Sequence, residues 1–368
     1  MKPLLISIVG ARPQFIKAAP LIQEIEDKGV FTQLILHTGQ HFDQNMSEVF
    51  FEELNIPKPA KNLEVVPGSH AQQTGSMMQG IEEFVRAHAP QMLLIYGDTN
   101  STLAGALVGV RLGIPMGHIE AGLRSFNKQM PEEINRIVAD QFSDLLFAPT
   151  ETASNNLENE GVSTTATHVV GDLMVDGVVI QSERAQTEST ILGELKLKSK
   201  DFILTTFHRQ ENTDNRERLS NVWKAILKLS QTETVVLALH PRTKLRLEAS
   251  GLSKEQESKL IIVEAQGYLD TLQLLSNSKL LLTDSGGMQK EAYALGVPCV
   301  TMRGESEWVE LLEAGVNQLA EPNNPKAILE AVDRMTGKVV VPKDLGLYGE
   351  GKTAAKIHEI LVAFFEDK

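Results

Sequence analysis

Short apolar runs alternate with longer amphipathic stretches along nearly the whole chain. This order is typical of parallel strands that are separated by crossover helices. The strands that we expect in the first half are 4–9, 33–37, 92–96, 115–119 and 145–148. Those that we expect in the second half are 202–207, 234–240, 260–263, 280–283 and 299–302. The pattern predicts an α/β protein.

Two similar motifs, 97–99 and 284–287, favour two similar domains. Each follows an apolar run, brings an Asp and a small hydroxylated residue to the start of a helix, and is followed by a Gly-x-Pro that launches the next strand. Gly-x-Pro linkers are common in parallel α/β proteins, so coincidence is the alternative. We predict two Rossmann-like doubly wound parallel-sheet domains that face one cleft, with ligands at the carboxyl ends of the strands.

The length of 368 residues agrees with two domains. We place the N-terminal domain at 1–171 and the C-terminal domain at 172–351, because polar segments separate the two sets of strands there. The last helix, 352–366, follows a glycine-rich stretch, and we expect it to pack back on the first domain.

Composition excludes several classes of protein. Lys and Arg total 35 against 48 Asp and Glu, a net charge of −13, so we expect neither a nucleic-acid partner nor an anionic membrane surface. A single cysteine, Cys299, excludes a disulfide framework and a cysteine zinc site. The first residues are typical of a strand rather than a signal peptide or membrane span, so the expected compartment is the cytoplasm.

Basic residues follow the first predicted strand. Arg12 and Lys17 lie near the start of a helix, where cations are mildly unfavourable for the helix itself. Their position therefore favours contact with an anionic ligand. The segment lacks the Gly-x-Gly-x-x-Gly spacing of dinucleotide-binding proteins.

Acidic residues follow the third and fourth predicted strands of the first half. Asp98 and Glu120 would come from neighbouring strand ends and could share one site. His118 and Glu120 would project from the same face of a strand. A metal site is the alternative interpretation, but no third ligand has convincing spacing.

Glu132 and Arg136 are four residues apart on a predicted helix. They could form a surface ion pair of little energetic value, or they could belong to the site. The preceding loop, 124–129, is polar and basic and could close over a substrate.

The second half contains matching candidates at its strand ends. His208 and Arg209 follow one strand and Arg242 follows the next, as a basic rim for phosphate contact or acid–base chemistry. A structural histidine is the alternative. Ser285, Gly286 and Gly287 open a helix whose free amides suit a diphosphate, unless they serve only as an N-cap.

Taken together, these motifs are specific. Segments 10–17, 97–99, 118–124, 131–136, 208–212 and 284–287 resemble, in order, those of the non-hydrolysing UDP-N-acetylglucosamine 2-epimerases. The resemblance implies a glycosyltransferase-B-like fold, a homodimer, a UDP-sugar substrate and no metal or other cofactor.

The resemblance also implies residue roles. Asp98, Glu120 and Glu132 would be the acid–base carboxylates, with Arg136 and His208 serving the diphosphate and transition state. Arg12 and Lys17 would line the same cleft, with Arg209 and Arg242 as further basic contacts. The diphosphate and ribose of UDP would be held by Ser285, Gly286, Gly287 and Glu291. Elimination of UDP and its re-addition would epimerise C2 for the synthesis of surface-polysaccharide precursors.

The chain departs from the commonest form of the family at several positions. Gln14 stands where glutamate is usual, loop 125–130 differs, and an allosteric arginine is missing around 71–74, although Gln40 and His41 of the same regulatory region are present. Together with segment 304–308, these variants resemble more closely the branch that acts on UDP-2,3-diacetamido-2,3-dideoxyglucuronate. A uronate would want a further cation, for which the candidates are Arg124, Lys128 and Arg303.

Three other functions fit many of these residues. They are a hydrolysing 2-epimerase that releases N-acetylmannosamine and UDP, a retaining UDP-sugar glycosyltransferase and a non-catalytic UDP-sugar sensor. The sensor would not require Asp98, Glu120 and Glu132 together.

Overall fold

A computed structural model describes residues 2–39, 54, 56–66, 68–251, 259–342, 346–349 and 351–366. The chain divides into two compact units. Unit 1 comprises Met1–Gly177 and Tyr348–Lys368, and unit 2 comprises Val178–Leu347. The division therefore lies after Gly177, inside helix α7 (Leu173–Glu188), rather than after Gly171.

The sheet of unit 1 is entirely parallel and has the strand order β3-β2-β1-β4-β5-β6-β7. Its strands are β1 (Leu4–Val9), β2 (Thr32–His37), β3 (Lys61–Asn62), β4 (Met92–Tyr96), β5 (Met116–Ile119), β6 (Leu145–Ala148) and β7 (Thr167–Val169). Its helices are α1 (Arg12–Lys28), α3 (His70–His88), α4 (Asn100–Leu112), α5 (Pro131–Phe142), α6 (Glu151–Asn159) and α17 (Thr353–Glu366).

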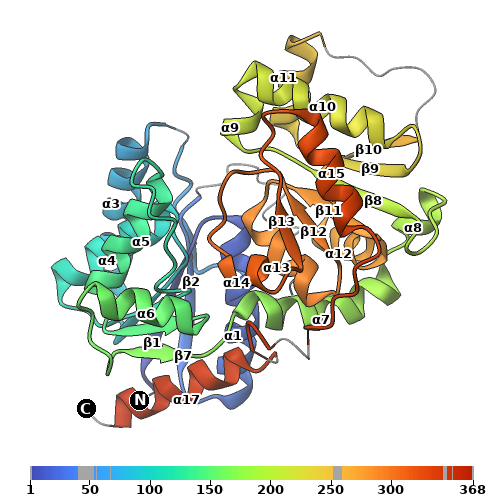
Figure 1. Cartoon of the computed structure of the whole chain (residues 1–368). Coiled ribbons are helices and arrows are strands. Elements are labelled where there is room, and N and C mark those ends of the chain that lie inside the picture. Colours follow the sequence, from blue (N-terminus) through green and yellow to red (C-terminus); the bar gives the residue numbers. More distant parts are fainter. Residues whose placement is uncertain are drawn as a thin grey trace. The chain divides into compact units, whose positions relative to one another are not determined.

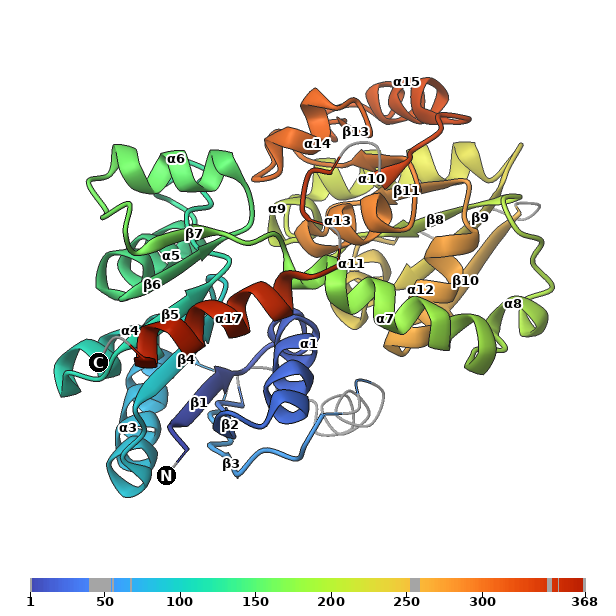
Figure 2. The same ribbon diagram turned by 90° about the horizontal axis from the view of Figure 1, so that it is seen from below.

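Helices cover both faces of this sheet, which explains why its central strands are buried and largely apolar. One core packs Ile6, Ile8 and Leu93 against α3 and α4. Helix α4 approaches the sheet closely, because a Cβ on Gly109 would lie 2.2 Å from the Met116 sulfur. The C-terminal helix α17 lies beside α1 (Figures 1 and 2), with the His358 ring 5.6 Å from that of Phe31.

Unit 2 repeats the arrangement with the order β10-β9-β8-β11-β12-β13, again all parallel. Its strands are β8 (Phe202–Thr206), β9 (Thr234–Leu239), β10 (Leu260–Glu264), β11 (Leu280–Thr283), β12 (Cys299–Thr301) and β13 (Asn317–Leu319). Its other helices are α8 (Ile191–Glu194), α9 (Gln210–Thr213), α10 (Arg216–Leu229), α11 (Pro241–Ala249), α12 (Tyr268–Asn277), α13 (Gly286–Ala294), α14 (Val309–Glu313) and α15 (Pro325–Met335).

Two apolar cores lie on opposite faces of the unit 2 sheet. One packs Val222, Trp223 and Ile226 of α10, together with α15, against strand residues such as Val235. The other packs α12 and α13 against Leu204 and Val236. Strand order reverses between β8 and β11 in this unit and between β1 and β4 in unit 1, where ligands of doubly wound sheets bind.

The predicted fold class of two parallel-sheet α/β domains is confirmed. All ten expected strands are present, with ends that differ by no more than one residue. Strands β3, β7 and β13 were missed, because they are only two or three residues long and two of them carry polar edge positions. Over the described residues, no helix is both long and apolar enough to span a bilayer.

Candidate active site

Glu120 lies just beyond β5, at the carboxyl edge of the unit 1 sheet. Its backbone is left-handed, with φ of 70°, and both Glu120 and Ala121 donate their N–H to the Phe147 carbonyl, at 3.1 and 3.2 Å. The carboxylate is 8% exposed and forms an ion pair with the equally buried Lys17 of α1.

The expectation that His118 and Glu120 share a strand face is wrong. The strand ends at Ile119 and the left-handed turn redirects Glu120 toward α1. The turn after β4 approaches the Glu120 carboxylate closely. Gly97 in this turn has φ of 63°, and a Cβ there would lie 3.2 Å from Glu120 Oε2. Asp98 is the next residue, so the two carboxylates belong to one site.

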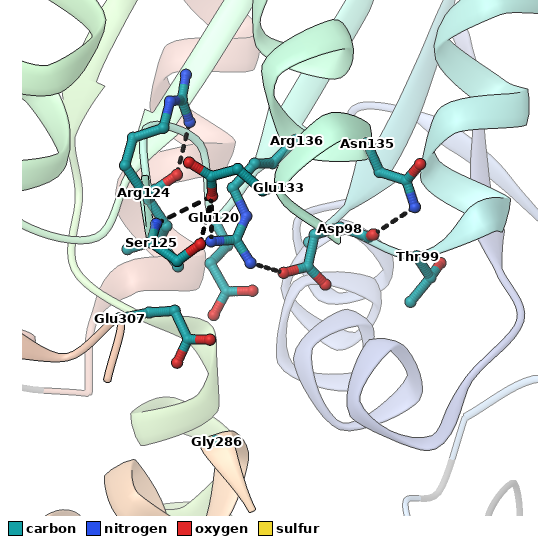
Figure 3. A network of polar contacts seen from close by, with 12 residues as sticks. Asp98, Thr99, Glu120, Arg124, Ser125, Glu133, Asn135, Arg136, Gly286 and Glu307 are labelled. Atoms are coloured by element: carbon teal, nitrogen blue, oxygen red, sulfur yellow. Dashed lines mark hydrogen bonds and ion pairs between the residues drawn. The ribbon is translucent and has the colours of Figure 1, made fainter. Parts of the chain in front are cut away.

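Asp98 forms an ion pair with Arg136 of α5, which is 3% exposed (Figure 3). Asn135 donates to the Asp98 carbonyl at 2.9 Å. Glu132 and Arg136 do not form the surface ion pair that was the alternative to a role in the site. Helix α5 begins at Pro131, which turns Glu133 and Arg136 inward and leaves Glu132 exposed. Arg136 Nη1 instead lies 3.1 Å from Glu133 Oε2.

Glu133 is a site residue that the sequence did not reveal. Its carboxylate accepts hydrogen bonds from the backbone N–H groups of Ser125 and Phe126, both at 2.9 Å, and from the Ser125 hydroxyl at 3.1 Å (Figure 3). Phe126 has φ of 59° and is 77% exposed. Glu133 therefore ties the start of loop 125–130 to the guanidinium that pairs with Asp98.

A second buried network lies behind the carboxylates. His118 Nδ1 lies 2.7 Å from Asp140 Oδ1, and its Nε2 lies 2.8 Å from the Gly97 carbonyl. The other Asp140 oxygen accepts from the Gly122 N–H at 3.2 Å and pairs with Arg124 at 2.7 Å. Arg124 also binds Glu160 through two nitrogens, at 2.7 and 2.6 Å.

Gln14 uses all of its amide capacity inside unit 1. Its oxygen accepts from the N–H groups of Gly10 and Ala11, at 2.8 and 3.0 Å, and its nitrogen donates to the Tyr96 carbonyl at 2.8 Å. A glutamate could not make that last bond. The departure noted at this position is therefore a structural link between the turns after β1 and β4.

In unit 2, Asp284 is fully buried and joins the turns after β8 and β11. It accepts from the N–H groups of His208 and Arg209, both at 3.0 Å, and from the Asn212 side chain at 3.0 Å. Ser285 is the N-cap of α13 but its side chain makes no capping bond to the helix. The proposed plain N-cap is therefore not what Asp284 and Ser285 form, and the first-turn amides of α13 suit an anion.

The glycine turn at the start of α13 is buttressed by Trp308. The indole Nε1 donates to the Gly286 carbonyl at 3.1 Å, and Lys290, 1% exposed, lies over the indole ring at 3.8 Å. A Cβ on Gly286 would lie 3.5 Å from Arg209 Nη2, which places that guanidinium beside the turn. Glu291 is also buried on α13.

The remaining basic candidates of unit 2 differ in their surroundings. The His208 ring stacks on that of His240 at 5.3 Å, and His208 Nδ1 lies 3.8 Å from Asp284. Arg242 pairs with Asp214 at 2.7 Å.

Glu307 of unit 2 is a buried carboxylate that pairs with Arg303. Burial by itself would raise the pKa of Glu307, but its hydrogen bonds with Arg303 and the charges of Arg303 and Arg209 outweigh this and lower the pKa to about 2.

Two of the three cations considered for binding a uronate already form buried ion pairs within the protein. Arg124 is buried against Asp140 and Glu160, and Arg303 is buried against Glu307. Lys128 lies exposed in loop 125–130.

Not every predicted residue can be placed. The side chain of Arg12, and all of Gln40 and His41, lie outside the described residues. In segment 71–74, where the family's allosteric arginine is missing, Gln72 accepts a hydrogen bond from the Ser69 N–H at 3.0 Å, at the start of α3.

Comparisons with known proteins agree with this geometry. The family model described as UDP-N-acetylglucosamine 2-epimerase matches residues 23–362. A Pseudomonas aeruginosa relative, UDP-2,3-diacetamido-2,3-dideoxy-D-glucuronate 2-epimerase, is 46% identical over 97% of this chain and 99% of its own. A Methanocaldococcus jannaschii relative, UDP-N-acetylglucosamine 2-epimerase, is 41% identical over 96% of this chain and 97% of its own.

Solved structures agree as well. The crystal structure of the Methanocaldococcus jannaschii UDP-GlcNAc 2-epimerase in complex with UDP-GlcNAc and UDP has a TM-score of 0.90 at 40% identity, covering 98% of this chain and 99% of that one. The Neisseria meningitidis enzyme bound to UDP-GlcNAc has a TM-score of 0.88 at 28% identity, covering 98% of this chain and all of that one. The family predicted from the motifs is confirmed: this chain belongs to the UDP-N-acetylglucosamine 2-epimerase family, and it is an isomerase of the epimerase type.

Proposed function

We propose that this protein inverts C2 of a UDP-activated 2-acetamido sugar by eliminating UDP and adding it back. The observation that carries the proposal is the pair of carboxylates at one sheet edge, each beside a buried cation. Glu120 pairs with Lys17, and Asp98 pairs with Arg136. Two carboxylates in different surroundings suit a reaction that removes a proton on one face of a sugar and returns it on the other.

The chemistry of the substrate explains why elimination is needed. The hydrogen on C2 of a 2-acetamido sugar has no adjacent carbonyl, so direct deprotonation is very difficult. When the C1–O bond breaks, UDP leaves with the bonding electrons and the C2 proton passes to a carboxylate, giving 2-acetamidoglucal. Protonation of C2 from the opposite face and re-addition of UDP at C1 give the epimer, with no net oxidation and no water consumed.

The proposed roles of the unit 1 residues rest on their contacts and on the family motif, and that of His208 in unit 2 rests on the motif. Glu120 beside Lys17 and Asp98 beside Arg136 are the candidates to remove the C2 proton and to return one on the opposite face. Glu132, which lies exposed on the first turn of α5, keeps the third acid–base role that the family motif implies. Arg136 and His208 would stabilise charge on the leaving diphosphate.

In unit 2 the start of α13 is the proposed diphosphate site. Its first-turn amides at Gly286 and Gly287 are not capped by Ser285, and Arg209 lies beside the turn. Glu291 would bind the ribose, and Arg12 and Arg242 would contribute positive charge.

A second candidate substrate is the 2,3-diacetamido-2,3-dideoxyglucuronate of UDP. It is favoured by the 46% identity to the Pseudomonas aeruginosa enzyme of that name. With Arg124 and Arg303 committed to buried ion pairs, Lys128 is the candidate of the three that remains exposed to meet a uronate carboxylate.

The test is incubation with each UDP-sugar in deuterated water, without an acceptor, while C2 is followed by NMR. We expect deuterium at C2 with the nucleotide sugar intact, and faster exchange with the true substrate. Free sugar with stoichiometric UDP would identify a hydrolysing epimerase instead. Absence of exchange with both sugars would contradict the proposal and leave the glycosyltransferase and the sensor.

We also propose a cytoplasmic homodimer that supplies surface-polysaccharide precursors. The family motifs are the ground for the homodimer. Light scattering should give about twice 40.5 kDa, and a monomer at all concentrations would contradict the dimer.

A further inference from the structure

His118 is completely buried and both of its ring nitrogens face acceptors. Nε2 lies 2.8 Å from the Gly97 carbonyl and Nδ1 lies 2.7 Å from Asp140 Oδ1. A backbone carbonyl can only accept, so Nε2 donates its hydrogen to Gly97, while Nδ1 contacts the Asp140 side chain. Asp140 also pairs with Arg124 inside unit 1.

Each of these two bonds leads to a proposed catalytic carboxylate. The Gly97 carbonyl belongs to the left-handed residue directly before Asp98, and the Gly97 N–H is held by the Ile119 carbonyl at 2.9 Å. On the other side, Asp140 holds the N–H of Gly122, two residues beyond Glu120, at 3.2 Å. The imidazole therefore joins the turn that carries Asp98 to the turn that carries Glu120.

We propose that His118 is a positioning residue that fixes Asp98 and Glu120 relative to each other, so that deprotonation and reprotonation of C2 both succeed before the intermediate escapes. The inference rests on the proposed epimerase function. His118 itself does not touch the substrate in this account; it acts through Gly97 and Asp140. A displacement of about 1 Å, caused by a change outside the reacting groups, can cost about 100-fold in rate.

Two amide substitutions separate the two bonds. In His118→Asn the amide nitrogen can replace Nδ1 and keep the bond to Asp140, while the Gly97 carbonyl loses its donor. In His118→Gln the amide nitrogen can replace Nε2 and keep the bond to Gly97, while Asp140 loses its contact with the ring. His168→Gln, on edge strand β7 of the same sheet and half-buried, is the matched control.

The variants should be compared by kcat, KM, UDP affinity and the ratio of UDP released to sugar epimerised, all per folded molecule. We expect both His118 variants to lose about 10- to 100-fold in kcat with KM changed by less than about threefold. We also expect the release ratio to rise, because a misplaced carboxylate gives the glycal time to dissociate. His168→Gln should match the unsubstituted protein in each measurement.

The inference and the proposed function fail in different ways. If the unsubstituted protein exchanges C2 but both His118 variants keep full kcat per folded molecule, His118 is not a positioning residue. The same conclusion follows if kcat falls only in proportion to the folded fraction, measured by thermal unfolding, with the release ratio unchanged. If the unsubstituted protein itself exchanges nothing, it is the proposed function that fails.

Discussion

Glu120→Gln should lower the rate of C2 exchange by about 10²- to 10⁴-fold, the usual contribution of a general acid or base. The glutamine keeps the shape of the side chain but cannot take up a proton. The variant also leaves the buried Lys17 ammonium without its carboxylate partner, so the protein should lose some stability as well as rate. Exchange should be measured by NMR in deuterated water.

UDP affinity separates a chemical defect from a folding defect. The proposed diphosphate and ribose contacts of unit 2 involve α13 rather than Glu120, so calorimetry should give a dissociation constant for UDP within a few-fold of the unsubstituted value. Glu151→Gln, at an exposed position on α6 of the same unit, is the control and should keep full exchange. If Glu120→Gln exchanged C2 at the normal rate, Glu120 would have no part in the mechanism.

Gly122→Ala should destabilise unit 1 by more than about 3 kcal/mol, since overpacking and left-handed strain would act together. Gly122 has φ of 82°, and a Cβ there would lie 2.2 Å from the Ala153 carbonyl oxygen and 2.8 Å from its carbon. The turn cannot retreat easily, because its N–H binds Asp140 and its carbonyl accepts from Asn156 at 3.0 Å. Urea unfolding would measure the loss.

A second glycine isolates the steric part of this effect. Gly161, just after α6, has nearly the same φ of 79°, yet nothing lies within 4 Å of the position its Cβ would take. Gly161→Ala should therefore cost only the strain of a left-handed alanine, about 1–2 kcal/mol. Equal losses in the two variants would show that the clash at Gly122 relaxes freely.

The pattern of apolar runs predicted the central strands of both sheets, because these strands are buried on both faces. Leu93, Leu94 and Ile95 of β4, for example, are all inaccessible to solvent, so the strand appears as an uninterrupted apolar run. Edge strands such as β3 lack that constraint, because Lys61 and Asn62 are both exposed. Nothing in their side chains distinguishes them from a loop.

The site was predicted in part. Motif positions at strand ends identified Asp98 and Glu120, but the partners of these residues come from distant segments and depend on how helices rotate. The spacing of Glu132 and Arg136 left a surface ion pair between them as one alternative, whereas the start of α5 turns Glu133 inward and pairs it with Arg136. The left-handed backbone of Glu120 could not be predicted from the sequence either, because non-glycine residues adopt this conformation only where tertiary contacts impose it.

The central claim is that the bond between C1 of the sugar and UDP breaks and forms again during epimerisation. A substrate that carries oxygen-18 only in the bridge between C1 and the β-phosphorus tests it directly by phosphorus NMR. Once released, the terminal phosphate of UDP can rotate before it adds back, so we predict that the label spreads from the bridging to the non-bridging positions as C2 inverts. Inversion of C2 with all of the label still in the bridge would contradict the account.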